Sequence, residues 1–174
     1  MVKTILLLGT LDTKGLEYGF VKQKITAQGH RTIVLDAGVR GSPLLKPDIT
    51  RDEVALAAGS TIQDIIEQGK EGVAIELMTK GATSIVQGLH HSGKIDGILA
   101  LGGSMGTSLA TAVMRSLPIG IPKVMVSTMA SSDTRPYLDN KDIVMIPSVA
   151  DIVGLNRVTK RVFAIAAGAI IGMV

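Results

Sequence analysis

The stretch from Lys3 to Asp36 decides the fold and reads KTILLLGTLDTKGLEYGFVKQKITAQGHRTIVLD. Its aliphatic run Lys3–Leu8 predicts a strand, and the apolar residues within Thr13–Gln28 recur at the spacing of a helix. A second run, Arg31–Leu35, predicts another strand directly after that helix. Strand, helix and strand joined by short connections predict a βαβ unit, in which the strands are parallel and the crossover is right-handed.

The rest of the chain repeats this alternation after a loop at residues 37–49 that is rich in glycine and proline. Thr50 and Glu53 have the spacing of a capping box at the start of a helix. The further elements expected are helices at residues 51–58, 62–68, 71–91, 108–116 and 156–171, and strands at residues 95–101, 123–126 and 143–146. We therefore predict a single α/β domain over residues 1–174, with a doubly wound, mainly parallel open sheet of about five strands in a Rossmann-like three-layer sandwich.

The composition agrees with a parallel sheet buried on both faces, because 46% of the residues are apolar and only 2% are aromatic. There is no cysteine, which excludes disulfides, thiolate metal sites and a cysteine nucleophile. The 18 basic residues are offset by 15 acidic ones and are scattered, so we do not expect nucleic-acid binding. The first apolar run lacks the length of a signal sequence, and we expect a cytoplasmic protein with no membrane partner.

The first candidate binding loop, GTLDTKG at residues 9–15, follows the first strand. The carboxyl end of a strand and the start of a helix together favour a bound anion. The loop is neither a P-loop nor the dinucleotide fingerprint, because its glycines stand at other positions. Asp12 or Thr13 could equally cap the following helix. The candidate nucleotide-binding residues here are Gly9, Thr10, Asp12, Thr13 and Lys14.

The second loop, at residues 102–107, carries the strongest signal in the chain. Three glycines let the backbone approach a ligand closely, and two hydroxyl side chains add hydrogen-bond donors. Tight packing of the strand against the helix could account for one or two of those glycines. We predict that this loop cradles phosphates through Gly102, Gly103, Ser104, Met105, Gly106 and Thr107.

The third loop follows the fourth strand and is rich in short polar side chains, which are also ordinary turn residues. Its weight comes from the expectation that it converges on the other two loops. The candidates here are Thr128, Ala130, Ser131, Ser132, Asp133 and Thr134. Asp36 ends the second strand, where dinucleotide-binding folds place a carboxylate on the ribose, although it could be a simple polar strand terminus. Asp12 or Asp133 could also hold Mg²⁺ through a phosphate.

The sequence leaves enzymatic activity open. No nucleophile, base and orienting group can be assembled from it, and the adjacent His90 and His91 point about 100° apart on a helix. The last helix has no charged residue in 162–174, which is too short a run to span a bilayer. We expect this helix to dock on another subunit, as in a homo-oligomer, or on a second domain.

Four ordered stretches resemble the N-terminal half of the Tm-1-like ATP-binding family. They are GTLDTKG at 9–15, LGGSMGT at 101–107, VSTMASSDT at 126–134 and SVADIVGLN at 148–156. The resemblance implies a two-domain protein of roughly double this length whose N-terminal domain binds ATP. Met105 and Ser132 stand where the family pattern would have glycine.

The leading hypothesis is therefore a domain that binds ATP, with Mg²⁺ as a candidate companion ion. The alternative is an enzyme component that binds a sugar phosphate or an activated small acid, with catalytic groups supplied by a partner domain. A third hypothesis is an assembly module that uses the C-terminal helix.

Overall fold

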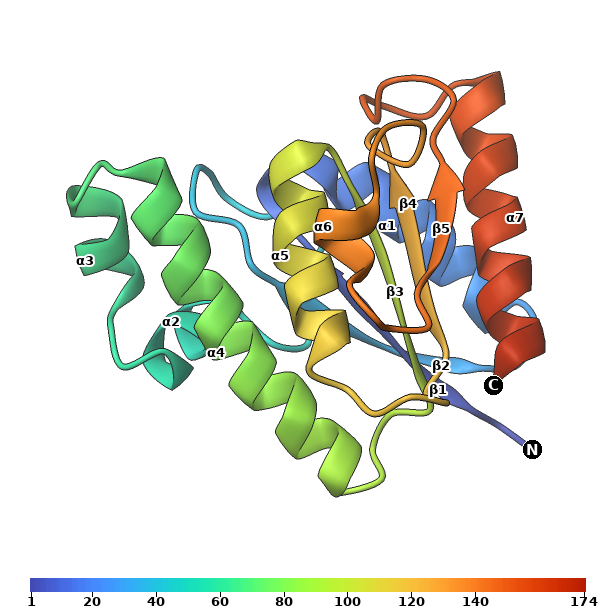
Figure 1. Ribbon diagram of the computed structural model, residues 1–174, viewed down its shortest axis with the longest axis horizontal. Coiled ribbons are helices and arrows are strands. Elements are labelled where there is room, and N and C mark those ends of the chain that lie inside the picture. The colour runs from blue at the N-terminus through green and yellow to red at the C-terminus, as the bar shows by residue number, and fades with distance from the viewer.

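The computed structural model describes residues 1–174 and contains one sheet of five strands. The strands are β1 (Thr4–Gly9), β2 (Arg31–Asp36), β3 (Gly97–Gly102), β4 (Lys123–Ser127) and β5 (Val144–Pro147). They lie in the order β2-β1-β3-β4-β5, and every neighbouring pair is parallel (Figure 1). The prediction of a doubly wound parallel sheet of about five strands is confirmed.

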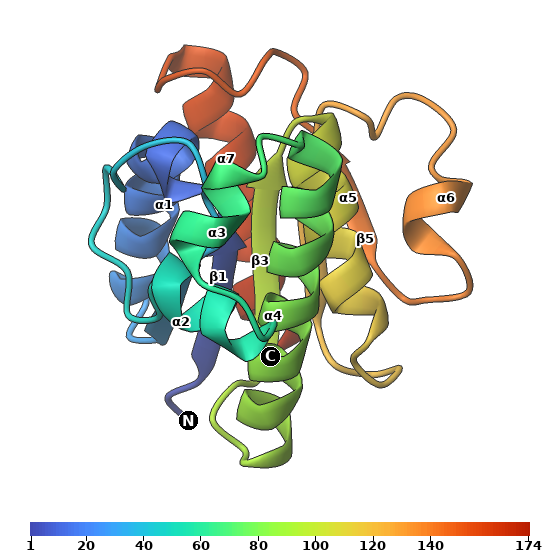
Figure 2. The same cartoon turned by 90° about the vertical axis from the view of Figure 1, so that its left-hand side faces the viewer.

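Helices cover both faces of the sheet (Figures 1 and 2). They are α1 (Leu11–Thr26), α2 (Arg51–Ala57), α3 (Ile62–Glu67), α4 (Glu71–His91), α5 (Ser104–Arg115), α6 (Arg135–Leu138) and α7 (Arg157–Met173). One face packs against α1 and α7 and the other against α2, α4 and α5, while α6 lies beside α5. This arrangement makes the three layers of the sandwich.

Alternate residues of the strands enter the two cores. In β1, Leu6 and Leu8 face the core under α4 and α5, whereas Ile5 and Leu7 face the core under α1 and α7. All four side chains are fully buried, and β3 in the centre of the sheet follows the same rule. The uninterrupted aliphatic runs in the sequence are therefore strands with no solvent-facing side.

The structure corrects where the two Gly-rich loops end. Helix α5 begins at Ser104 and not at residue 108, and α1 begins at Leu11 and not at residue 13. A Cβ atom on Gly102 would lie 2.9 Å from the backbone of Gly106, so only glycine lets the chain turn so tightly from strand into helix. Much of each predicted binding loop is consequently the first turn of a helix.

Elsewhere, local sequence signals predicted some element boundaries correctly. The capping box of Thr50 and Glu53 is formed as predicted at the start of α2. Pro147 ends β5 at the edge of the sheet, where a missing backbone donor is tolerated. The short α6 was not expected.

The last helix buries one side and exposes another. Its residues Val162, Phe163 and Ile170 pack on the sheet, whereas Val158 and Ile165 are exposed, Ile165 by 52%. One face of this apolar helix is thus uncovered in the domain, and its docking on another subunit or a second domain stays a prediction. None of the helices has both the length and the apolar character that a bilayer-crossing segment requires.

Candidate functional site

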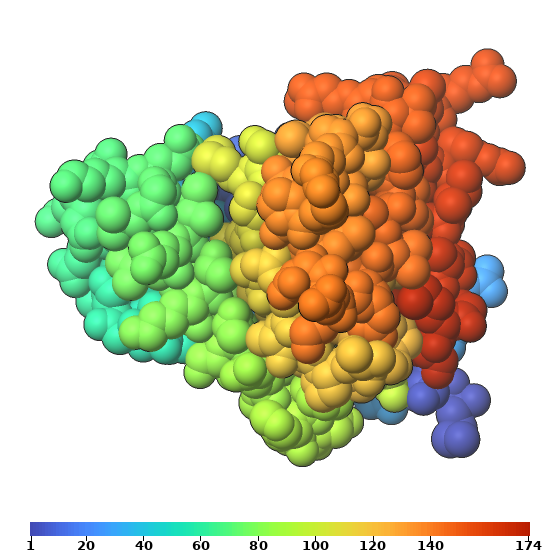
Figure 3. Space-filling view, viewed as in Figure 1, coloured from blue at the N-terminus to red at the C-terminus, as the bar shows by residue number.

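A cavity of about 270 Å³ lies at the carboxyl ends of β1 and β3. These strands flank the point where the strand order reverses, which is where open α/β sheets bind ligands. We call it the switch-point cavity. Its lining comprises Thr10, Asp12, Thr13, Lys14, Ala37, Val39, Arg40, Glu71, Ala74, Ile75, Met78, Gly102, Gly103, Ser104, Met105, Gly106 and Leu109. Figure 3 shows the recess between the green surface of α4 and the yellow start of α5.

A buried tyrosine on α1 bridges β1 and β3 near their carboxyl ends. The ladder between β1 and β3 ends at the pair Leu8 and Ala100. Beyond it, the Tyr18 hydroxyl accepts a hydrogen bond from the Leu101 N–H at 2.7 Å and bonds to the carbonyl of Leu8. Burial raises the pKa of Tyr18 well above its usual value, so the hydroxyl stays protonated.

The same tyrosine explains a glycine that we had assigned to ligand binding. A Cβ atom on Gly9 would collide with the Tyr18 ring. Gly9 is also absent from the lining of the switch-point cavity. Its position is accounted for by the packing of the tyrosine, whether or not a ligand binds nearby.

The floor of the cavity is the uncapped start of α5. Gly103 occupies the N-cap position and makes no side-chain capping bond. The first backbone N–H of α5 that donates to a carbonyl is that of Thr107, which reaches the Gly103 carbonyl at 2.8 Å. The N–H groups of Ser104, Met105 and Gly106 therefore have no backbone acceptor, as expected for a first helical turn. Three free donors and the positive end of a helix dipole meet the cavity here.

Gly103 itself is sterically free. A Cβ atom there would meet nothing closer than the Thr128 hydroxyl oxygen at 3.9 Å, and the backbone angles suit any residue. Gly102 is required by packing, but Gly103 is not. An open glycine beside free amides leaves room for a ligand to approach the backbone.

Two predicted ligand residues have structural partners instead. Thr107 is fully buried, and its hydroxyl pairs with that of Ser127 at 2.6 Å. Asp36 is 1% exposed, and its Oδ1 accepts hydrogen bonds from the N–H groups of Leu11 and Gly38 at 3.0 and 2.9 Å. Burial outweighs these bonds and raises the Asp36 pKa. Asp36 organises the two loops above β1 and β2 and does not line the cavity.

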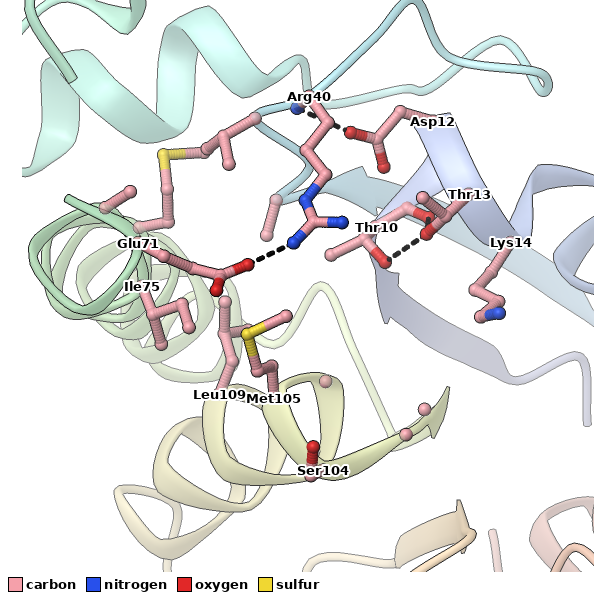
Figure 4. A pocket seen from close by; sticks show the side chains of 17 residues that line it. Thr10, Asp12, Thr13, Lys14, Arg40, Glu71, Ile75, Ser104, Met105 and Leu109 are labelled. Atoms are coloured by element: carbon pink, nitrogen blue, oxygen red, sulfur yellow. Dashed lines mark hydrogen bonds and ion pairs between the residues drawn. The ribbon is translucent and has the colours of Figure 1, made fainter. Parts of the chain in front are cut away.

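Asp12 is the carboxylate that does line the cavity. Its Oδ2 accepts from the backbone N–H groups of Arg40 at 2.7 Å and Gly41 at 3.2 Å. Its Oδ1 is buried and has no hydrogen-bond partner. In Figure 4 this second oxygen points toward the space between Arg40 and Thr13. An unsatisfied buried acceptor is costly, which marks this oxygen as available to a ligand donor.

The mouth and the wall of the cavity are formed by residues that the sequence analysis did not assign to the site. Arg40, from the loop after β2, forms an ion pair with Glu71 at the start of α4 (Figure 4). Behind this pair, Ile75, Met78 and Leu109 form an aliphatic wall. No local motif marks these residues, because they meet only when α4 folds over the switch point.

Lys14 also lines the cavity, but its ammonium group hydrogen-bonds to the carbonyl of Ile152 in the loop before α7. This bond directs the end of the side chain toward that loop. Thr10 and Thr13 pair their hydroxyls at 3.0 Å beside it. The structure thus brings the first two predicted loops together, with four residues of the first and five of the second in one cavity.

The third loop lines a different cavity, of about 510 Å³, at the carboxyl ends of β4 and β5. We call it the β4–β5 cavity, and its lining is Ser127, Thr128, Ser131, Pro147, Ser148, Val149, Ala150 and Asp151. The two cavities are neighbours, since Thr128 of the β4–β5 cavity donates its N–H at 3.3 Å to the carbonyl of Gly102, which lines the switch-point cavity. The single shared pocket that we expected is therefore divided in two.

Four residues predicted from the third loop, Ala130, Ser132, Asp133 and Thr134, line neither cavity. Asp133 is exposed and forms a two-pronged contact with Arg135, at 2.9 and 2.8 Å. These bonds from Arg135 lower the Asp133 pKa. No group of three or more His, Asp or Glu side chains is arranged to hold a metal ion.

A family model and similar bacterial proteins point to the same protein family. The family model for the N-terminal domain of an uncharacterised protein family, UPF0261, matches residues 3–174. A UPF0261 protein of Clostridium tetani is 52% identical over 100% of this chain, which covers 43% of that protein. A UPF0261 protein of Brucella suis biovar 1 is 41% identical over 97% of this chain and 40% of that protein.

The ToMV resistance protein Tm-1(GCR237) of Solanum lycopersicum is 46% identical over 59% of this chain, which covers 14% of that protein. Among solved structures, Drosophila melanogaster DJ-1beta aligns with a TM-score of 0.39 and 15% identity, over 97% of this chain and 91% of that one. The chain spans about two-fifths of the length of the bacterial relatives it matches. On the match over residues 3–174 and on these identities, the chain belongs to the UPF0261 family, as its N-terminal domain.

Proposed function

We propose that this domain binds a nucleotide, with ATP as the leading candidate, and that the phosphates lie on the first turn of α5. The observation that carries the proposal is the set of free backbone donors at Ser104, Met105 and Gly106, beside a glycine with open space around it. Oriented amides at a helix start bind phosphate without any side-chain cation. Arg40, paired with Glu71, lines the mouth of the same cavity.

The size of the cavity determines what must move. A volume of about 270 Å³ lies just below the usual range of about 300–1,000 Å³ for small-molecule sites. A whole nucleotide therefore requires the mouth to open at the ion pair between Arg40 and Glu71. Both side chains are more than half exposed, at 64% and 53%, and such a surface pair contributes only about 0–1 kcal/mol. Opening is therefore energetically cheap.

The remaining groups suit the rest of a nucleotide. The aliphatic wall of Ile75, Met78 and Leu109 would face the base. Asp12, with its unpartnered Oδ1, replaces Asp36 as the proposed acceptor for a ligand hydroxyl. Mg²⁺ is usually held by one or two carboxylates together with substrate phosphates, and Asp12 and Glu71 are the two carboxylates of this cavity.

Isothermal titration with ATP, ADP, NAD and a sugar phosphate, with and without Mg²⁺, tests the proposal. We expect heat of binding with a nucleotide and none with the Gly103→Val variant, because the added side chain occupies the approach to the α5 amides. Gly88→Val is the matched control, since Gly88 is an exposed glycine on α4 with open space around it. Absence of heat with every nucleotide would reject nucleotide binding.

A second candidate is an enzyme component that holds a sugar phosphate or an activated small acid, with catalytic groups from a partner domain. It is supported by the length of the bacterial relatives, of which this chain covers about two-fifths. Turnover that appears only when the remaining polypeptide is added would favour it. Equal turnover by this domain alone would contradict it.

We also propose that the exposed side of α7 packs on the remaining domain of the longer family members. Val158, Ile165 and Met173 expose apolar surface along this helix. In a full-length relative, a lysine in place of the residue equivalent to Ile165 should loosen the two domains, as measured by limited proteolysis between them. Unchanged protection would contradict this docking.

A further inference from the structure

The β4–β5 cavity is lined by different residues from those of the proposed nucleotide site. Its volume of about 510 Å³ lies within the range of small-molecule sites. Like the switch-point cavity, it lies at the carboxyl ends of the strands, but the two cavities share no lining residue. Nothing in the proposed nucleotide site uses it.

Ser148 presents a hydroxyl to the cavity. This residue is 3% exposed and lines the cavity. Its backbone N–H donates to the Ser127 carbonyl at 3.1 Å, but its hydroxyl has no hydrogen-bond partner within the protein. The residue as a whole is nearly buried, but its hydroxyl is not sealed from the cavity and is free to bond to a molecule held there.

The other polar groups around it indicate the kind of ligand. The hydroxyls of Thr128 and Ser131 also have no partner in the protein, and the exposed carboxylate of Asp151 forms no ion pair. None of the lining residues is lysine, arginine or histidine. Hydroxyls and a carboxylate without a cation suit a neutral ligand that bears several hydroxyl groups, and the charge of Asp151 opposes an anion.

A strained residue stands at the same cavity. Val149 follows Ser148 and has a φ angle of 66°, which β-branched side chains rarely adopt. Its side chain is 78% exposed, so burial does not compensate for the strain. Strain of this kind persists where surrounding structure imposes it, commonly at binding sites. The strained backbone at Val149 lies in the loop that places Ser148 and Asp151 at the cavity.

We propose that the β4–β5 cavity binds a small, neutral, polyhydroxylated molecule of the sugar or polyol class, independently of the phosphate site on α5. The Ser148 hydroxyl is the central contact. Thr128, at the border with Gly103, places this ligand next to the proposed phosphate position.

Two-dimensional ¹H–¹⁵N NMR of the domain with D-ribose, D-glucose and myo-inositol at tens of millimolar tests the proposal. We expect at least one of them to shift the amide signals of residues 127–131 and 148–151. Ser148→Ala should weaken that binding by about three- to tenfold, the usual value of one neutral hydrogen bond. Ser84→Ala, on the exposed side of α4, is the control and should leave it unchanged.

Three results would overturn the proposal: no shift of those amides by any of the three compounds, equal binding by the Ser148→Ala variant, or stronger shifts of the same amides by inorganic phosphate. The outcome is separate from that of the nucleotide test, which is read from the heat of titration with nucleotides and its loss in the Gly103→Val variant. Either site can fail while the other stands.

Discussion

Replacing Tyr18 with phenylalanine should destabilise the domain although it removes a single oxygen atom. The ring keeps its packing, but the Leu101 N–H loses its acceptor at 2.7 Å and the Leu8 carbonyl loses a donor. Each buried polar group left unsatisfied costs about 1–3 kcal/mol, and the carbonyl, with a second lone pair, lies at the lower end. We therefore expect the free energy of unfolding to fall by about 2–4 kcal/mol.

A loss of that size would lower the melting temperature by roughly 4–16 °C for a domain of this length. Urea unfolding followed by circular dichroism would measure it as a lower midpoint with an unchanged slope. Tyr137→Phe is the control, because the Tyr137 hydroxyl has no hydrogen-bond partner and is only partly buried. The Leu101 amide should also exchange its hydrogen faster in the Tyr18→Phe variant. Equal stability of the two variants would refute the bridging role of Tyr18.

Three further predictions concern single contacts. Asp142 has a pKa below its usual value, because the hydrogen bonds from the Lys123 ammonium and the Gly120 N–H, together with the charge of Lys123, outweigh burial. The contribution of Asp142 to stability is therefore present above the usual carboxyl pKa and is lost as the pH falls through the lowered value. Asp142→Asn should therefore lower the urea midpoint at neutral pH but hardly in strong acid, and an equal effect at both would contradict the linkage. Gly38→Ala should weaken nucleotide binding in calorimetry while the domain stays folded. The new Cβ atom would lie 2.7 Å from the Asp12 carboxylate and would displace it. Unchanged affinity would argue against a role for Asp12 in binding. Val149→Gly should raise the free energy of unfolding by about 1 kcal/mol by relieving the positive φ, and a loss of stability in urea would show that the angle is not strained.

The candidate site was predictable only in part. The position of the site at the switch point follows from the alternation of strands and helices. The glycines at the ends of β1 and β3 correctly indicated the edge of the sheet formed by the carboxyl ends of the strands. The roles of individual residues in the site could not be predicted from the sequence. Asp36 and Thr107 are polar residues at the expected positions, yet both are buried against backbone or hydroxyl partners that come from other loops.

What the sequence determined by itself was local or periodic: the aliphatic runs buried on both faces, the βαβ order and the capping box of Thr50 and Glu53. These depend on neighbours within a few residues or on the alternation of side chains along a strand. The tertiary structure alone decided that Tyr18 bridges β1 and β3, that Arg40 meets Glu71, and that Ser148 keeps a free hydroxyl. Such contacts join segments distant in the chain, and no spacing within one segment records which of them will meet.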